Sequence, residues 1–281
     1  MEDTALMEQL RASLLGPYEV RRTKKQKTAF LTWVTGYAED LGVRVTVEES
    51  GKAIHSRNIV FGDVDKARTI ITAHYDTCAW MPTGAVTTPG CWAILLLTEL
   101  VQLVLLVPLL AIMFFGVSNP HTANDNTSGV LLMLLLMAQM KDRPDVAFVL
   151  FDNEETGLWG SQAFIRAHPQ AARRFLLNLD CVGDGDTLLF TGVPRGLRMP
   201  QAMRLQKAME EITPRYGMST AGGAFPKWMY PSDQMLFPRG TALAALKGKK
   251  LLYLNRIHTP RDTVLEERNL LCLAEIIWQA V

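Results

Sequence analysis

The sequence is poor in cysteine, and this scarcity limits the kinds of protein that it can encode. Its 281 residues include only four cysteines, Cys78, Cys91, Cys181 and Cys272, which are widely spaced and form no CxxC pair. This density is far below that of a small disulfide-bonded scaffold. We therefore expect reduced thiols, most of them buried.

An excess of charge of either sign is also missing. Basic side chains number 29 and acidic ones 28, so the net charge is +1. Such a balance gives no long-range attraction for nucleic acid or for an acidic partner, and a polyanion-binding function is disfavoured. Residues 1–15 lack the basic start, apolar middle and cleavage site of a secretory signal, so we expect a cytoplasmic location.

No internal repeat or low-complexity linker divides the chain. α/β enzymes of this length often form one continuous sheet, so we predict a single domain over 1–281. Residues 5–42 carry helical signals and a basic cluster, for which we expect a solvated helix face, with contact to acidic lipid as the alternative. The cluster consists of Arg21, Arg22, Lys24, Lys25 and Lys27.

Several short segments have the composition of β-strands. Residues 43–49 alternate as a strand should, and four later apolar runs end in polar or acidic residues and are typical of buried central strands. These runs span 67–76, 145–155, 175–183 and 249–258, and helices are predicted over 129–140, 158–167, 201–212 and 266–280. The alternation favours a three-layer α/β/α sandwich with a mixed, mostly parallel sheet and a ligand site at the carboxyl ends of the strands.

Ionisable residues follow these predicted strands. His74 and Asp76 point to the same side of an extended segment, so one can bind a metal while the other fixes its tautomer. Glu154 and Glu155 end the second run, where two adjacent carboxylates are costly unless a cation neutralises them. Because neighbouring residues of a strand point opposite ways, one glutamate can bind the metal while the other reaches a water molecule.

Three further candidates complete the set. Asp125 lies in the loop NDNTSG, which taken alone would be an ordinary helix N-cap. Asp180 ends the third apolar run and His258 ends the fourth. Two imidazoles with at least three carboxylates form a nitrogen and oxygen ligand set that suits zinc and suits calcium poorly.

These segments resemble, in their order, the motifs of a known enzyme family. AHYD, NDNTSG, NEETGLWGS, NLDCVG and IHTPRD are similar to motifs of the co-catalytic di-zinc aminopeptidases related to bacterial leucyl-type enzymes and to glutamate carboxypeptidase. The resemblance runs from about His74 to Asp262. It implies the zinc-exopeptidase fold and a peptide substrate whose free α-amine is held by carboxylates, so that residues are removed from the N-terminus.

The resemblance also implies which residues hold two zinc ions. Asp125 would bridge them, His74 and Asp180 would complete one site, and Glu155 and His258 would complete the other. Glu154 would be the general base that takes the proton of the attacking water and passes it to the leaving amine. Asp76 would orient His74.

Two positions depart from the family pattern. Some relatives carry a tyrosine as oxyanion donor just before the last histidine, but Ile257 stands there, so Tyr253, Tyr230 or no tyrosine takes that role. The stretch 232–234 reads Ser-Asp-Gln where the family has Ser-Asp-His, and no chemistry is assigned to it.

A third departure is an apolar segment, Cys91–Val117, between two of the expected ligands. As one straight helix it would reach about 40 Å, enough for a single membrane crossing but too short for two. A single crossing would separate His74 from Asp125, so we expect a helical hairpin broken near Pro108, within an insertion over 84–118. The hairpin would meet a membrane surface or a second subunit, and an internal apolar layer is the remaining alternative.

Other functions fit the same sequence less well. A one-zinc acyltransferase resembling glutaminyl cyclase would share the fold and release ammonia from N-terminal glutamine. A catalytically silent binding protein would need neither Glu154 nor the five ligands. A membrane transporter would draw only on Cys91–Val117, which cannot line a pathway unless it oligomerises.

Overall fold

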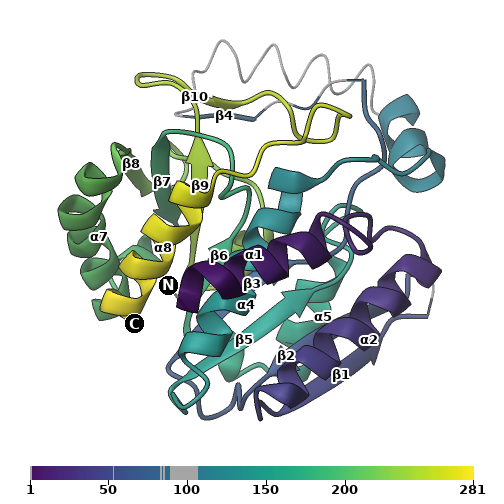
Figure 1. Ribbon diagram of the computed structural model, residues 1–281, viewed down its shortest axis with the longest axis horizontal. Coiled ribbons are helices and arrows are strands. Elements are labelled where there is room, and N and C mark those ends of the chain that lie inside the picture. The colour runs from purple at the N-terminus through teal and green to yellow at the C-terminus, as the bar shows by residue number, and fades with distance from the viewer. Residues whose placement is uncertain (1, 53, 83, 85, 89–106) are drawn as a thin grey trace.

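One eight-stranded sheet organises the molecule, as the computed structural model of residues 2–52, 54–82, 84, 86–88 and 107–281 shows (Figure 1). Its strand order is β1-β2-β5-β3-β6-β9-β7-β8. The strands are β1 Val45–Ser50, β2 Ser56–Phe61, β3 Thr69–His74, β5 Val146–Phe151, β6 Phe175–Leu179, β7 Thr187–Gly192, β8 Ser219–Ala224 and β9 Gly240–Leu246.

The middle of this sheet is parallel. β5, β3, β6 and β9 run in the same direction, whereas β1, β2 and β7 each meet a neighbour in antiparallel pairing. Parallel strands end at the same edge of a sheet, and a ligand site is expected there. The predicted mixed, mostly parallel α/β fold is confirmed.

Helices cover both faces of the sheet, and this explains the continuous apolar runs in the sequence. In β3, Ile71 and Ala73 pack on one core while Ile70 packs on the core of the opposite face. A strand that is buried on both sides has no polar face, so its residues do not alternate.

The predicted helices agree with the observed ones to within a residue or two. α2 begins with a capping box, in which the Thr23 side chain accepts from the Gln26 N–H and the Gln26 side chain reaches back to the Thr23 N–H. The helices are α1 Glu2–Leu14, α2 Lys24–Asp40, α4 Gly129–Gln139, α5 Trp159–Ala167, α6 Pro194–Leu197, α7 Pro200–Ile212 and α8 Glu267–Ala280.

The prediction of a central strand over 249–258 is wrong. Only β10, Leu252–Leu254, is extended there, and it pairs with β4, Val86–Thr88, in a separate two-stranded sheet. The central place beside β6 is taken by β9, whose sequence GTALAAL is rich in alanine and has Thr241 as its one β-branched residue. Small residues suit this position because β9 is buried throughout.

The prediction of a solvated basic face in α2 and the segment before it holds for only part of the cluster. Lys24 and Lys25 are exposed, but Arg21 is completely buried and Lys27 is 8% exposed. Lys27 donates from Nζ to the carboxylate of Asp152 and to the side-chain oxygen of Asn153, so a buried anion compensates its charge.

The apolar segment Cys91–Val117 lies partly outside the described residues. Its described part forms a helix over 107–115, which stands at the periphery of the molecule (Figure 1). After this helix the chain returns to the body, where Ser118 forms a β-bridge with Ala79. Among the helices of the described residues, none is long and apolar enough to cross a membrane.

Candidate metal centre

Three neighbouring parallel strands deliver ionisable residues to one edge of the sheet. His74 is the last residue of β3, Glu154 and Glu155 lie in the turn after β5, and Asp180 follows β6 directly. β3 pairs with both of the other strands, so their carboxyl ends are adjacent. Residues that are far apart in the sequence therefore meet at this edge.

The two remaining predicted ligands, Asp125 and His258, lie on loops that reach the same edge of the sheet. Asp125 lies in the turn Ala123–Ser128, where its own backbone leaves the helical conformation before α4 begins. His258 follows β10 and reaches the same place from the opposite side. The buried carboxylate of Asp262 accepts from the N–H groups of Asn124 and Asp125, at 2.9 and 3.0 Å, and fixes the Asp125 turn.

The Asp125 carboxylate lies between the two imidazoles. One oxygen, Oδ1, is 3.3 Å from Nε2 of His74, and the other, Oδ2, is 2.9 Å from Nε2 of His258. Asp180 Oδ1 is 3.7 Å from the His74 nitrogen, and Glu155 Oε2 is 3.3 Å from the His258 nitrogen. All five residues predicted from the sequence are thus brought together, in two groups that share Asp125.

The donor atoms fit metal ions. His74, Asp125 and Asp180 each offer an atom within 4.8 Å of the other two, and Glu155 and His258 form such a group with Cys78. Two buried oxygens of this cluster, Glu155 Oε1 and Asp180 Oδ1, have no hydrogen-bond partner among the described residues. Buried carboxylate oxygens without partners are costly unless a cation binds them.

Cys78 was not predicted from the sequence as a neighbour of the site. Burial raises the pKa of its thiol well above the usual value, and the charges of Glu155 and Asp125 raise it further. Its sulfur lies within 4.8 Å of a donor atom of Glu155 and of His258, so Cys78 stands directly beside this part of the site.

The NDNTSG loop does more than begin a helix. Asn126 donates to the carbonyl of Leu179 at 2.9 Å and accepts from the N–H of Cys181 at 3.2 Å. Asn124 accepts from the N–H of Gly183 at 2.7 Å. These buried side chains clamp the residues on both sides of Asp180, and they explain why so polar a loop is completely buried.

Asp76 contacts two parts of the site: the turn that carries Glu154 and Glu155, and the side chain of His74. Its two carboxylate oxygens accept from the N–H groups of Glu154 and Glu155, at 3.0 and 3.2 Å. Nδ1 of His74 lies 3.1 Å from the main-chain oxygen of Asp76 and 3.7 Å from its carboxylate. Asp76 therefore fixes the position of both elements, and its carbonyl is the nearer partner of His74.

Arg21 lies beneath the site and was not predicted to have a role. Its guanidinium donates to the carbonyl of Tyr75 at 2.6 Å and to the hydroxyl of Thr127 at 3.0 Å. These residues follow His74 and Asp125 closely in the chain. Burial lowers the pKa of Arg21 to about 10, while the charge of Asp76 opposes that shift, so the side chain is a cation at neutral pH. Arg21 thus joins the two ligand-bearing segments and offsets part of their negative charge.

The charges of the site shift its ionisable groups strongly. Burial alone would lower the pKa of His74, but Glu154 and the hydrogen-bonded carboxylates raise it well above the usual value. Burial would raise the pKa of Asp125, but its hydrogen bonds with His258 and His74 lower it. Without metal, protonated imidazoles would therefore balance the carboxylates, and metal binding would release those protons.

Glu154 is a candidate for proton transfer. Burial raises its pKa well above the usual value; His74 lowers it, while Asp233 and Glu155 add to the increase. A carboxylate whose pKa is raised accepts a proton more readily than an ordinary carboxylate does.

Uncommon backbone conformations occur beside the ligands. Asn153, Cys181 and His258 are non-glycine residues with φ of 57°, 53° and 59°. Such left-handed conformations cost free energy and persist where the surrounding structure enforces them. They adjoin Glu154 and Asp180 and include one ligand, so strain is concentrated at the candidate centre.

The two tyrosines considered as oxyanion donors lie in different surroundings. Tyr230 is 4% exposed and its hydroxyl donates to the carbonyl of Asp180 at 3.3 Å. Tyr253 is 37% exposed in the two-stranded sheet. Tyr230 is the one placed against a predicted ligand.

Asp233, to which the sequence assigned no chemistry, is completely buried. Neither of its carboxylate oxygens has a hydrogen-bond partner among the described residues. Burial raises its pKa to about 7 and the charges of Asp76 and Asp180 add to the increase, although the Ser161 hydroxyl and the charge of His74 lower it. It is therefore a buried, protonatable acid near the predicted ligands.

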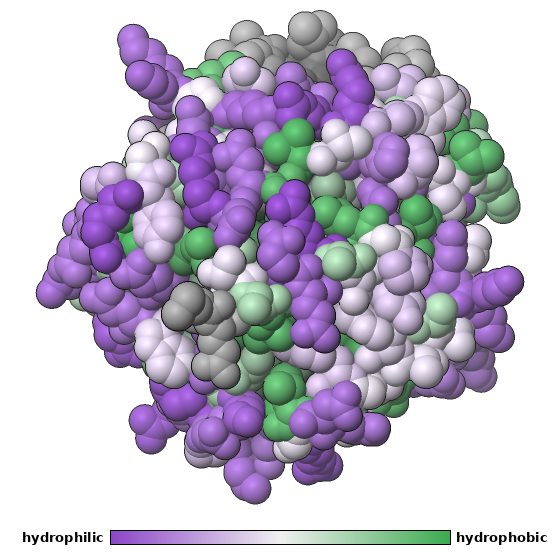
Figure 2. Space-filling view, in the orientation of Figure 1, coloured by the Kyte–Doolittle hydropathy of each residue, from purple (hydrophilic) through white to green (hydrophobic). Residues whose placement is uncertain are grey.

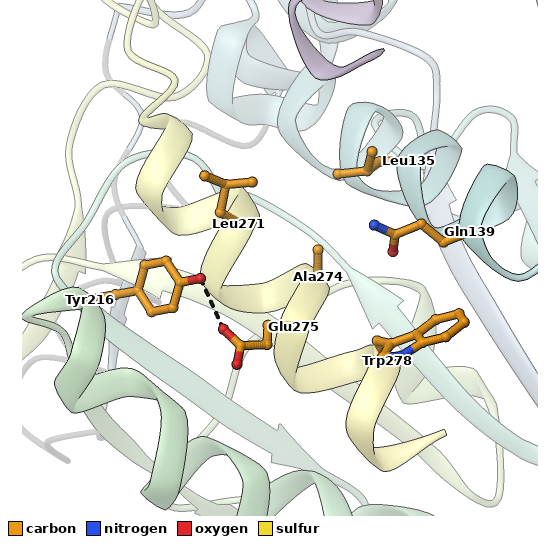
Figure 3. A pocket seen from close by; sticks show the side chains of 7 residues that line it. All are labelled: Leu135, Gln139, Tyr216, Leu271, Ala274, Glu275 and Trp278. Atoms are coloured by element: carbon orange, nitrogen blue, oxygen red, sulfur yellow. Dashed lines mark hydrogen bonds between the residues drawn. The ribbon is translucent and has the colours of Figure 1, made fainter. Parts of the chain in front are cut away.

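Two small cavities adjoin the site, and a larger cavity lies elsewhere. A cavity of about 80 Å³ is bordered by Cys78, Met113 and His258, and another of about 110 Å³ by Trp228 and Tyr230. A cavity of about 470 Å³ lies instead between α4, α8 and the Tyr216 turn (Figure 3). It is lined by Leu135, Gln139, Tyr216, Leu271, Ala274, Glu275 and Trp278 and contains none of the predicted ligands.

Solved structures of the same fold cover almost the whole chain. A leucine aminopeptidase precursor from Bacteroides thetaiotaomicron superposes with a TM-score of 0.66 at 16% identity, over 99% of this chain and 96% of that chain. A glutaminyl cyclase from the same organism gives 0.64 at 16% identity, over 99% and 97%. A zinc aminopeptidase from Bacillus subtilis gives 0.52 at 20% identity, over 80% and 49%. At these low identities, the structural similarity shows that this chain shares the fold of those proteins.

Membership of a family rests on the sequence itself. No curated protein matches the chain. The model of Peptidase family M28, however, matches residues 59–280, a span that contains the three central strands and all five predicted ligands. Since this is well over half of the 281 residues, the chain belongs to peptidase family M28.

Proposed function

We propose that the protein is a zinc-dependent aminopeptidase, which hydrolyses the N-terminal residue of peptides. The observation that carries this proposal is the Asp125 carboxylate, which presents one oxygen toward His74 and the other toward His258. A carboxylate in that position can bridge two metal ions. The same proposal treats 1–281 as one peptidase domain, with 84–118 as an insertion.

The grouping of side chains supports two ions. His74 and Asp180 lie on the Oδ1 side of Asp125, and Glu155 and His258 lie on the Oδ2 side. When bound there, zinc would lower the pKa of a water molecule and polarise the scissile carbonyl.

The chain's own residues would then move the proton. A Glu154 carboxylate oxygen accepts a proton from the attacking water as its oxygen bonds to the carbonyl carbon. The same carboxyl then gives that proton to the amide nitrogen as the carbon–nitrogen bond breaks and the amine leaves. The raised pKa of Glu154 suits both transfers.

The acidic side chains of the site support a substrate with a free α-amine. A carboxylate oxygen that is not bound to metal can accept a hydrogen bond from the α-ammonium group, and the site holds the carboxylates of Asp125, Glu154, Glu155 and Asp180 close together. We therefore propose that recognition of the N-terminus restricts cleavage to the first peptide bond.

The direct test is Glu154→Gln. The amide keeps the shape of the side chain but cannot accept the proton, so kcat should fall about 100- to 10,000-fold while zinc content and folding stay unchanged. Glu210→Gln, on the exposed face of α7, is the matched control and should keep full activity. Near-normal kcat for Glu154→Gln would refute Glu154 as the base, and Asp76 would be tested next.

Glutaminyl cyclase is the competing function, because a cyclase shares the fold over nearly all of the chain. A panel of aminoacyl reporter substrates should therefore be assayed beside an N-terminal glutaminyl peptide. We expect release of the first residue from several reporters and no ammonia from the glutaminyl peptide. Ammonia release without peptide-bond cleavage would replace the aminopeptidase proposal with the cyclase.

A further inference from the structure

Backbone contacts join three segments along one side of the molecule. The N–H of Trp80 donates to the carbonyl of Val117 at 2.9 Å, and β4 pairs with β10. The segments are 107–118, 247–261 and the described residues of 79–88, which are 79–82, 84 and 86–88, and we call their shared surface the apolar-basic face. β4 and β10 lie together at the top of the view, and the 107–115 helix lies at its upper right (Figure 1).

Large apolar side chains are exposed on this face. Phe115 is 88% exposed, Val107 is 77% and Val117 is 70%. Trp80 and Phe114 are also close to half exposed, at 46% and 43%. Figure 2 shows hydrophobic surface at the upper right edge, where Figure 1 places the 107–115 helix. Single exposed apolar residues need no explanation, but a cluster of this kind marks a contact surface.

The charged residues of the face are all of one sign. None of the three segments contains an aspartate or a glutamate. Lys249, Lys250 and Arg261 are exposed there, next to the half-exposed Leu251 and Tyr253. The net charge of the whole chain is only +1, so the absence of acidic side chains from these three segments is a local property of the face.

The beginning of α2 adds to the same charge. Arg22 donates to the carbonyls of Gly116 and Met113, at 2.6 and 3.0 Å, so it holds the end of the 107–115 helix. Lys24 and Lys25 stand in the first turn of α2 and are exposed. One cation therefore contacts the end of the 107–115 helix, and two more stand at the start of α2.

We propose that the apolar-basic face docks onto a lipid bilayer that carries anionic headgroups. Exposed phenylalanine, tryptophan and valine side chains would enter the boundary between headgroups and acyl chains, while lysines and arginines would contact the headgroups.

The charge distribution favours a bilayer over a second copy of the chain. In a twofold dimer the same patch meets itself, so the cations of the two copies would face each other with no acidic partner from these segments. An anionic bilayer instead satisfies both the apolar and the basic side chains.

Docking would place the candidate metal centre close to the membrane. The N–H of Met81, within the face, donates to the carbonyl of His258 at 2.8 Å. This inference does not rest on the proposed peptidase activity, because the surface and the chemistry are separate features of the chain.

The test is vesicle flotation of the full chain. We expect it to float with vesicles of phosphatidylcholine mixed with phosphatidylserine, to float weakly with phosphatidylcholine alone, and to be released by salt. The double variant Phe114→Ser, Phe115→Ser should weaken binding at least tenfold. Its matched control is Met203→Ser, Trp278→Ser, which removes exposed apolar side chains from α7 and α8 and should bind normally.

A second double variant tests the contribution of the basic side chains of the face. Lys249→Glu, Lys250→Glu should weaken binding to the anionic vesicles by about fivefold or more for each lost cation. Lys207→Glu on α7 is the control and should have little effect. Both pairs of variants should keep the native circular dichroism spectrum and melting temperature.

Two results would overturn the proposal. One is an unmodified chain that does not float with anionic vesicles, or that floats equally well after the Phe114, Phe115 and Lys249, Lys250 substitutions. The other is a chain that sediments as a dimer, does not float, and becomes a monomer on Phe114→Ser, Phe115→Ser, which would make the face an interface between copies.

Discussion

The two halves of the candidate centre are built differently, although they share Asp125. In the inner half, the His74 side chain is 1% exposed and the Asp180 side chain 7%, and both stand at the ends of central strands. In the outer half, the His258 side chain is 32% exposed and belongs to a loop beyond the separate two-stranded sheet. A rigid strand end holds a ligand in one position, whereas a loop permits exchange, so we expect the inner half to bind metal more durably.

Asp125→Ala would break both halves at once and should have the largest effect. Without the shared carboxylate, each ion loses a ligand, and the buried imidazoles lose their common anion. We expect zinc content below one ion per chain by elemental analysis and no measurable peptidase activity. The control Asp142→Ala removes an exposed carboxylate after α4 and should retain full zinc. Full zinc content in Asp125→Ala would show that Asp125 does not bridge.

A chelator should distinguish the two halves in the unmodified protein. We expect zinc to leave in two kinetic phases, with the outer ion leaving first because His258 is accessible and lies on a loop. His258→Ala should remove the fast phase and leave about one ion, while His74→Ala should remove the slow one. A single phase, or loss of both ions from His258→Ala, would contradict a difference between the halves.

Arg21→Met would test what supports the inner half. The substitution removes a buried cation together with its hydrogen bonds to Tyr75 and Thr127. We expect a loss of about 3–5 kcal/mol in the free energy of unfolding, measured with urea on chelated protein. Lys25→Met, at an exposed position of α2, should cost little.

A purely structural role for Arg21 would leave the metal affinity of folded protein unchanged. We expect instead that Arg21→Met weakens zinc binding, and that Arg21→Lys, which restores the charge, recovers part of it. Equal zinc affinities in all three proteins would refute an electrostatic role.

Asp233→Asn should have the smallest effect, and the effect should depend on pH. Below about pH 4 the carboxyl is protonated in both the folded and the unfolded chain. As pH rises toward 7, the unfolded chain loses this proton while the folded chain keeps it, so stability falls, and above 7 the loss is constant. The Asp233→Asn variant has no carboxyl group at this position, so its stability does not fall in this way as the pH rises.

We therefore expect chelated Asp233→Asn to be more stable than the unmodified protein by about 2–4 kcal/mol above neutral pH, with little difference near pH 4. Urea unfolding at the two pH values measures this. A variant that is less stable at high pH would show that Asp233 is ionised and paired in the folded protein.

The sequence predicted the parts of the site that strand ends supply. His74, Glu155 and Asp180 stand where apolar runs stop, and a buried strand that ends in an acid or an imidazole is visible without a structure. The division of the five residues into two groups was implied by the resemblance to the di-zinc aminopeptidases, and the structure brings the five side chains close to one another. The fold followed from the same runs, because continuous apolar strands alternating with helices require covered faces.

The features that the sequence did not predict depend on contacts between residues that are distant in the sequence. Arg21 looked like one of several surface cations, and only its burial against Tyr75 distinguishes it from Lys24. β9 was missed because alanine carries little strand signal, and 249–258 was misplaced because its leucines resemble a core strand. Tertiary packing decides both cases, and composition alone does not reveal it.

The most direct test of the account is the zinc content of the purified protein, measured together with its peptidase activity during chelation and zinc readdition. If Asp125 is shared by two ions, the purified protein should contain close to two zinc ions per chain. Its peptidase activity should disappear on chelation and return when zinc is added. Full peptidase activity in protein stripped of metal would contradict the account.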